Sequence, residues 1–409
     1  MPGICLPTGC IFDIMDWEGT LHIRPIMCGS ILNLDALYEA TSMADSNYSS
    51  DEKIPLEDAT DEFITEKQGN YSQNLKYILE MWIDWCADRN VTTITDITAL
   101  TMRHYASSLK RRARSDNGIA ASTARTYYNY ISAFLSWAVE VEYRVENPAE
   151  KRKATKLLPN SRTNSGDQQF WSPEQRQAIT EFTDKRAREA IEADNIDPFE
   201  PVRNRAIVHV LAYTGVRGSE VLADYRDERR NGLRWGDVDL ENSVITVLGK
   251  SQNPHEEVGL PGQTIQPLRR LRTLVDPPTD SWPVFPSRHP PSLYSRIEDA
   301  GYDKPDGDTW DFMLEKSIQP PPMSTSGART LLKRLSKEVA VPGLDLEDGD
   351  YLTLHGARRG VGEKLYRERG AAAAQRTLRH ADPQTTSEMY SHIEASELAA
   401  DNTEVFDTE

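Results

Sequence analysis

Apolar positions recur with a helical period through residues 60–146, which predicts a group of packed helices. The segment "NYSQNLKYILEMWIDWCADRN" places on one stripe Leu75, Ile78, Leu79, Trp82 and Trp85. The segment "ASTARTYYNYISAFLSWAVEVEYRVENP" places on another Tyr127, Tyr130, Ile131, Phe134, Leu135 and Ala138. Between them, "DITALTMRHYASSLKRRAR" predicts a third helix. We expect most of these aromatic side chains to lie in a core.

The periodicity is lost in "NPAEKRKATKLLPNSRTNSGDQQFW", which predicts an interdomain linker. A helical pattern returns after Trp171, where Ser172 can cap a helix that begins at Pro173. The segment "EPVRNRAIVHVLAYTG" predicts a buried helix that ends at Gly215. Alternating residues in "SVITVLGK" and "HEEVGL" predict a small antiparallel hairpin. Residues 276–325 are rich in Pro and Asp and predict mostly connection with one short helix.

The predicted fold class is therefore mainly α with a small antiparallel β-hairpin or sheet. We expect two domains that could form a clamp. The expected boundaries are an N-terminal extension over 1–58, a helical domain over 59–150, a linker over 151–170, a second domain over 171–398 and an acidic tail over 399–409. The segment 391–409 contains six acidic residues and no Lys or Arg.

The N-terminal extension holds three of the four cysteines of the chain, which are too few for a disulfide framework. A zinc site formed by Cys5, Cys10, His22 and Cys28 is one interpretation, although the paired C-x-x-C spacing of strong zinc motifs is absent. The simpler interpretation is that translation starts at Met43, so that an acidic, flexible leader follows.

The net charge of −17 argues at first against a nucleic-acid partner. The distribution of charge along the chain weakens this argument. Residues 61–160 contain 14 Lys and Arg against 12 Asp and Glu, a net charge of +2, so the rest of the chain carries −19. A solvated surface and DNA contacts explain the basic clusters in this part about equally well. The candidate DNA-binding residues are Lys110, Arg111, Arg112, Arg114, Arg125, Lys151, Arg152 and Lys153.

Acidic residues outside this basic part are typical of a protein from a high-salt cytoplasm, such as that of a halophilic archaeon or of its virus or plasmid. The sequence has no run of about 18 apolar residues and no secretion signal at the N-terminus. We therefore expect a cytoplasmic protein without a membrane partner.

Candidate chemistry is concentrated in a few short motifs. "AYTGVRGSEVLAD" puts Arg217 just beyond a helix end, with Glu220 one turn further on. In "TLHGARRGVGEKLY", His355 and Arg358 are spaced i and i+3 and share a helix face. Each motif by itself is weak, because an Arg near a Glu is usually a surface ion pair. The order in which they occur along the chain is much more specific.

The segment "LRHADPQTTSEMYSHI" adds a histidine and a tyrosine to this order. Asp382 can cap a helix that begins at Pro383 and runs toward about Leu398, with His380 at the electropositive start of the helix. Tyr390 is the only tyrosine after Tyr366. A lone helical tyrosine is usually a core residue, so only the other motifs favour a chemical role.

Taken together, these motifs resemble the tyrosine recombinase, or phage integrase, family. "TGVRGSEV" resembles its first arginine motif, "VLGK" its hairpin lysine motif, "LHGAR" its H-x-x-R motif and "LRHADPQTTSEMYSHI" its histidine and tyrosine helix. The resemblance covers about residues 60–395 and implies a helical core-binding (SAM-like) domain and a catalytic domain that close around DNA. Lys250 is the only lysine between Lys185 and Lys304, and so the only candidate for the hairpin cation.

The resemblance implies that Tyr390 attacks a DNA phosphodiester and forms a 3′-phosphotyrosyl intermediate, with neither ATP nor a metal cofactor. Arg217 and Arg358 would hold the non-bridging phosphate oxygens, because guanidinium groups donate in pairs and stay charged.

The remaining roles are implied in the same way. Lys250 would protonate the departing 5′ oxygen, His355 would accept or relay a proton and His380 would bind the phosphate. Glu220 would orient the first arginine.

One feature departs from the family pattern. The tyrosine usually follows the last histidine by nine residues, whereas here the distance from His380 to Tyr390 is ten, and Arg379 replaces a glycine. Because one helical residue rotates a side chain by about 100°, the final helix must start later or bulge.

These features favour a site-specific DNA recombinase that integrates or excises a mobile element through a Holliday junction. Its expected partners are double-stranded DNA attachment sites and further copies of the chain in a tetramer on DNA. The alternatives are a chromosome-dimer resolvase with the same chemistry, a DNA-binding regulator without catalysis, and, less favoured by size and motif spacing, a type IB topoisomerase.

Overall fold

The computed structural model describes residues 53–67, 69–160, 168–249, 255–387 and 389–390. The candidate zinc ligands of the N-terminal extension, Met43, Lys250 and the acidic tail lie outside these residues. Within the described ranges, no helix is long and apolar enough to cross a membrane.

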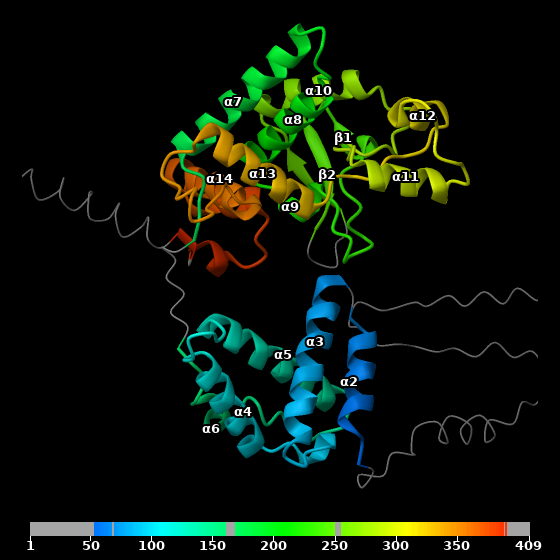
Figure 1. Cartoon of the computed structure of the whole chain (residues 1–409). Coiled ribbons are helices and arrows are strands. Elements are labelled where there is room, and N and C mark those ends of the chain that lie inside the picture. Colours follow the sequence, from blue (N-terminus) through cyan, green and yellow to red (C-terminus); the bar gives the residue numbers. More distant parts are fainter. Residues whose placement is uncertain (1–52, 68, 161–167, 250–254, 388, 391–409) are drawn as a thin grey trace, which may run out of the picture. The chain divides into compact units, whose positions relative to one another are not determined.

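Residues 53–160 form a helical group, as the apolar pattern predicts (Figure 1). Its elements are α2 (Leu56–Thr65), α3 (Gly69–Ala87), the 3₁₀ turn η1 (Ile94–Asp96), α4 (Ala99–Arg112), α5 (Ala121–Glu140) and the short α6 (Arg152–Thr155). Thr98 caps α4, because its hydroxyl accepts a hydrogen bond from the Thr101 N–H. Aromatic side chains fill the core. The ring centroid of Phe134 lies 5.6 Å from that of Phe63 and 6.0 Å from that of Trp82.

The buried face of α5 differs in part from the predicted stripe. Tyr128 is buried, whereas Tyr127 and Tyr130 are only half-buried. On the partly exposed side, Tyr130 stacks on Tyr71 with 5.1 Å between ring centroids. In α3, likewise, Trp85 is half-buried beside a fully buried cysteine. Aromatic rings can lie at the edge of a helix face with one side wet, which makes the edge of an aromatic stripe ambiguous.

Residues 168–390 form a second group, which contains many helices and one small sheet (Figure 1). The helices are α7 (Pro173–Glu192), α8 (Phe199–Thr214), α9 (Gly218–Val221), the 3₁₀ turn η3 (Trp235–Asp237), α10 (Gly262–Val275), α11 (Pro290–Asp299), α12 (Thr309–Glu315), α13 (Thr325–Val339), α14 (Leu354–Arg369) and α15 (Ala371–Leu378). Residues 383–387 and 389–390 are helical as well.

The predicted hairpin is confirmed and has a third strand. Strands β1 (Val238–Asp239), β2 (Val244–Leu248) and β3 (His255–Gly259) form an antiparallel sheet in the order β1-β2-β3. Val247 of β2 is paired with Glu256 of β3. The fold class is therefore mainly α with a small antiparallel sheet, as the sequence predicts.

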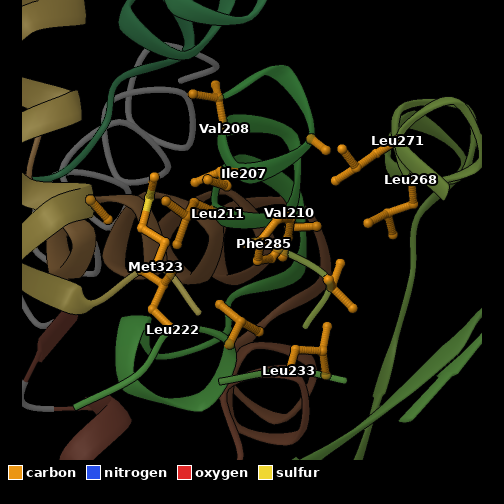
Figure 2. Packing of buried hydrophobic residues seen from close by; sticks show 14 of the residues in the cluster. Ile207, Val208, Val210, Leu211, Leu222, Leu233, Leu268, Leu271, Phe285 and Met323 are labelled. Carbon is orange, nitrogen blue, oxygen red and sulfur yellow. The ribbon is translucent and has the colours of Figure 1, made fainter. Parts of the chain in front are cut away.

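Helix α8 is the centre of the core of this second group. Nearly all its residues are buried, and it packs against α7, α10 and α14. Figure 2 shows Ile207 and Leu211 of α8 among apolar side chains from the rest of the group, including Leu268 of α10 and Phe285. The helix ends at Gly215, whose φ of +71° is left-handed and favours glycine. This end positions the first candidate arginine.

The prediction for residues 276–325 is wrong in part, because this region contains two helices, α11 and α12, and contributes to the core. Trp282, Val284 and Phe285 are buried. The backbone there pairs with other segments, since the Val284 N–H donates to the Leu233 carbonyl at 2.9 Å and the Met323 N–H donates to the Phe285 carbonyl at 2.7 Å. Extended segments held by such bonds have no helical or alternating signature in the sequence.

Candidate active site

Arg217 and Glu220 are held together by the turn that follows α8. Arg217 occupies the N-cap position of α9, and its backbone N–H donates to Glu220 Oε2 at 2.7 Å. Its Nη1 donates to the other carboxylate oxygen at 2.6 Å. The Glu220 side chain is fully buried while that of Arg217 is about one-quarter exposed, at 24%. The Glu220 carboxylate therefore holds Arg217 in place, and part of the Arg217 guanidinium stays open to a ligand.

Arg358 on α14 joins this turn to the end of α15. Its Nη1 donates to the Gly215 carbonyl at 2.6 Å, and its Nη2 donates to the Leu378 carbonyl. The residue is 3% exposed, and burial, followed by the nearby charge of Arg217, lowers its pKa to about 10. Two guanidinium groups of like charge thus lie close together. An anion such as a phosphate would relieve their repulsion.

His355 and His380 lie beside these arginines. Desolvation of the ring, followed by the nearby charges of Arg359 and Arg358, lowers the pKa of His355 to about 4, although the residue as a whole is exposed. Burial, followed by Arg358 and Arg217, lowers the pKa of His380 to about 4 as well. Both imidazoles are therefore neutral at pH 7. A neutral imidazole can accept a proton, and each ring also has one N–H to donate.

His380 is oriented by the final helix. Its Nδ1 lies 2.9 Å from the hydroxyl of the buried Thr386. The helix begins at residue 383, and Asp382 Oδ1 accepts from the Gln384 N–H at 2.9 Å. This confirms the predicted cap and start, while its predicted end lies outside the described residues.

Tyr390 lies in an apolar cluster against α14. It is fully buried, and its ring centroid is 5.2 Å from that of Tyr366 and 6.2 Å from that of Phe170. Its hydroxyl donates to the Arg359 carbonyl at 3.3 Å. Burial raises the pKa of the phenol well above its ordinary value. In this conformation the hydroxyl is bound to backbone, so an attack on a phosphate requires the side chain to move.

The structure describes the strand that leads to Lys250 but not the lysine. The Arg230 guanidinium donates to the carbonyls of Leu248 and Gly249 at 3.3 Å each, and to that of Ser219 at 3.1 Å. It therefore ties the end of β2 to α9. Neither Arg230 nor Arg379 is among the residues that the motifs predict to act at the site. The arginine in place of a glycine before His380 was the one available signal.

The candidate DNA-binding residues lie in the first helical group. Most are exposed, with Lys110 and Arg125 half-buried, and Lys110, Arg111 and Arg112 form the last turn of α4. Three of the candidates have partners within the chain, one of them Arg112, whose Nη1 donates to Met81 Sδ at 3.3 Å. Arg125 Nε donates to the Pro159 carbonyl at 2.7 Å, and Lys151 forms an ion pair with Glu146. The sequence alone does not reveal these contacts.

Comparisons with known proteins identify the family and the shared fold. The model of the phage integrase family matches residues 180–397. A comparison with curated proteins found no match. Among solved structures, the integrase of transposon Tn1549 in complex with transposon right end DNA is similar with a TM-score of 0.52 and 16% identity, over 85% of this chain and 100% of that one.

A second similar structure is the XerH site-specific recombinase bound to its palindromic difH substrate in a post-cleavage complex. Its TM-score is 0.51 with 13% identity, over 91% of this chain and 89% of that one. At these identities the structures show the shared fold. The family model covers more than half of the chain, which therefore belongs to the phage integrase family and is a tyrosine-type site-specific recombinase.

Proposed function

We propose that this chain integrates or excises a mobile DNA element, with Tyr390 as the nucleophile that cuts and rejoins the strands. The observation that carries the proposal is the convergence of Arg217, Arg358, His355 and His380, which come from three separate segments, next to the helix of Tyr390. The DNA-bound Tn1549 integrase, which has a similar fold, supports DNA as the partner.

The proposed chemistry conserves the energy of the phosphodiester bond. The Tyr390 oxygen attacks the phosphorus, its proton passes to His355, and the bond to the 5′ oxygen breaks. Lys250 protonates the leaving oxygen. The product is a 3′-phosphotyrosyl link and a free 5′ hydroxyl, and attack by a 5′ hydroxyl from another strand reverses the step. Two such exchanges produce and resolve a Holliday junction within a tetramer.

The two arginines provide most of the electrostatic stabilisation in this proposal. The phosphorus centre gains negative charge as the fifth oxygen approaches, and the guanidiniums of Arg217 and Arg358 are already fixed when it does. His380 adds a hydrogen bond from its remaining ring nitrogen. We further propose that residues 59–150 form the core-binding domain and residues 171–398 the catalytic domain of a clamp around DNA.

Covalent trapping tests the proposed function. Wild type and Tyr390→Phe are incubated with nicked duplexes that span the ends of the element encoding the chain, from low to molar KCl, and then denatured. We expect a protease-sensitive protein–DNA adduct with wild type and none with Tyr390→Phe, which still binds the DNA. Persistence of the adduct at molar KCl is the result expected of a salt-adapted protein.

Tyr366→Phe is the matched control, because it removes the hydroxyl of a neighbouring buried tyrosine, and it should form the adduct. Binding without any adduct in wild type would contradict the proposal and favour a regulator without catalysis. An adduct with the chromosomal dimer-resolution site but not with the element's ends would favour the resolvase role.

A further inference from the structure

Arg379 has a backbone conformation that an arginine seldom adopts. It follows the last residue of α15 with φ +53° and ψ +49°, in the left-handed region. Its N–H donates to carbonyls of the preceding turn, as at a helix end that normally carries glycine. A side chain at such a position is strained unless its contacts compensate, so these contacts indicate why arginine is present.

The guanidinium of Arg379 connects three segments of the catalytic group. Its Nη2 donates to Glu220 Oε2 at the start of α9, and its Nε donates to Glu256 Oε2 of β3 at 2.9 Å. Its Nη1 donates to the Thr377 carbonyl at 3.3 Å, within its own segment. The side chain is only 12% exposed. All three nitrogens of the group are therefore used, and little of it faces solvent.

Glu220 is the carboxylate that also holds Arg217. One of its oxygens accepts from Arg217 Nη1, and the other accepts from the Arg217 N–H and from Arg379 Nη2. Burial alone would raise the pKa of Glu220, but the charge of Arg379 and the hydrogen bonds from Arg217 outweigh it and keep the pKa below its ordinary value. Without Arg379, the buried carboxylate would lose half of its charged partners.

Glu256 extends the connection to the β-hairpin. It is paired with Val247 across the sheet, and a methyl group added at Gly249 would lie 2.5 Å from its Oε1. Gly249 directly precedes Lys250 in the chain. At its other end, Arg379 directly precedes His380. The Arg379 side chain thus connects three parts of the site. These are Glu220, which holds Arg217, strand β3, which pairs with the end of β2, and the segment that carries His380.

We propose that Arg379 is a positioning residue of the recombination site, which aligns Arg217 through Glu220 and sets the hairpin and His380 relative to it. This inference rests on the proposed function of the site. Arg379 acts through its two carboxylate partners and does not need to touch DNA. Its loss should therefore slow strand cleavage more than it weakens DNA binding.

Single-turnover cleavage of the nicked duplex that gives most adduct with wild type tests the proposal. Arg379→Gly relieves the left-handed backbone but removes a charged partner of the buried Glu220, so its urea unfolding midpoint is measured and cleavage is compared only where the variant is folded. We expect its cleavage rate to fall at least tenfold while the dissociation constant for DNA changes less than twofold. Arg379→Lys, which can reach one carboxylate at a time, should recover part of the rate.

Arg376→Ala is the matched control, because Arg376 lies in the last turn of α15, just before Arg379, is exposed, and donates to the Ala372 carbonyl within that helix. This variant should cleave at the wild-type rate. Equal losses in Arg376→Ala and Arg379→Gly would assign the effect to the missing positive charge alone and overturn the proposal. A cleavage rate for Arg379→Gly within twofold of wild type would also overturn it.

A double-variant comparison tests the route through Glu220. If Arg379 acts through this carboxylate, Arg379→Gly should lower the rate much less in a Glu220→Gln background than in wild type. Full additivity of the two losses would show that Arg379 acts independently of Glu220. Absence of an adduct with wild type would instead refute the proposed function and the inference with it, so the two failures are distinguishable.

Discussion

Gly362 allows Tyr390 to lie against α14, and the substitution Gly362→Ala should disturb this contact selectively. A methyl group at this position would lie 2.9 Å from Tyr390 Cζ, closer still to its hydroxyl oxygen, and 2.5 Å from Leu378 Cδ1. All three approaches are below normal van der Waals distance. Because Tyr390 is fully buried, its ring has to move if the methyl group is to fit.

The magnitude follows from two opposing effects. Overpacking a core contact of this kind costs about 1–3 kcal/mol. Alanine is favoured over glycine in a helix interior by about 1 kcal/mol. We therefore expect Gly362→Ala to lower the free energy of unfolding by about 0–2 kcal/mol. The penalty falls on the buried conformer of Tyr390, so it also raises the population in which the hydroxyl is free.

If release of Tyr390 limits cleavage, a penalty of about 1.4 kcal/mol on the buried conformer should raise the single-turnover rate about tenfold. Gly360→Ala is the control, because a methyl group there would approach the Trp171 backbone instead of Tyr390. It should lower stability without accelerating cleavage. Cleavage by Gly362→Ala at or below the wild-type rate, with DNA binding intact, would refute the view that burial of the tyrosine restrains the reaction.

A second variant locates the clash. Tyr390→Phe removes the atom nearest to the added methyl group and loses only a long hydrogen bond, at about 0.5–1 kcal/mol. The combined variant Gly362→Ala, Tyr390→Phe should be more stable than the sum of the single losses predicts, by about 1 kcal/mol. If the two losses of unfolding free energy measured in urea simply add, the methyl group at position 362 does not clash with the Tyr390 hydroxyl, and the ring of Tyr390 has moved away from it.

The histidines and the start of α14 lead to two further predictions. Because the pKa values of His355 and His380 are lowered to about 4 in the folded protein, the unfolded chain binds more protons below pH 7, and the free energy of unfolding should fall between pH 7 and 5. In a variant with glutamine at both positions, the urea midpoint should depend less on pH over this range than it does in wild type. An equal pH dependence in the variant and in wild type would exclude the effect. Gln169 donates to the Tyr351 carbonyl and accepts from the Thr353 N–H, both at 2.7 Å, so Gln169→Ala should lose about 1–3 kcal/mol of unfolding free energy and slow cleavage. Unchanged stability in urea would show that these bonds are replaced by water.

Local signals in the sequence allowed several elements to be predicted. The alternation in "SVITVLGK" and "HEEVGL" predicts the pairing that Val247 and Glu256 show. Ser172 caps α7 and Gly215 ends α8 as expected, because side-chain caps and left-handed ends depend on a few adjacent residues. Contacts between distant segments leave no such pattern, and for this reason the pairing of residues around Val284 with Leu233 could not be predicted.

The same distinction applies to the candidate site. The motifs single out Arg217 and Arg358, but not the fact that Arg358 holds the carbonyls of Gly215 and Leu378. A side chain that donates to backbone carbonyls imposes no requirement on the residue types that supply them. Arg379 could be noticed only as an arginine in place of a glycine, since its two partners, Glu220 and Glu256, are more than 120 positions away along the chain.

The final helix positions both His380 and Tyr390, which are ten residues apart. The helix starts at residue 383 rather than at the histidine, and the Thr386 hydroxyl binds His380 from within the first turns. Within this helix, Tyr390 faces Gly362 and Tyr366. A residue pattern identifies which tyrosine can react, but its conformation depends on packing. In this chain the packing favours the buried conformer. If Tyr390 is the nucleophile, as we propose, DNA binding must supply the free energy that releases its hydroxyl.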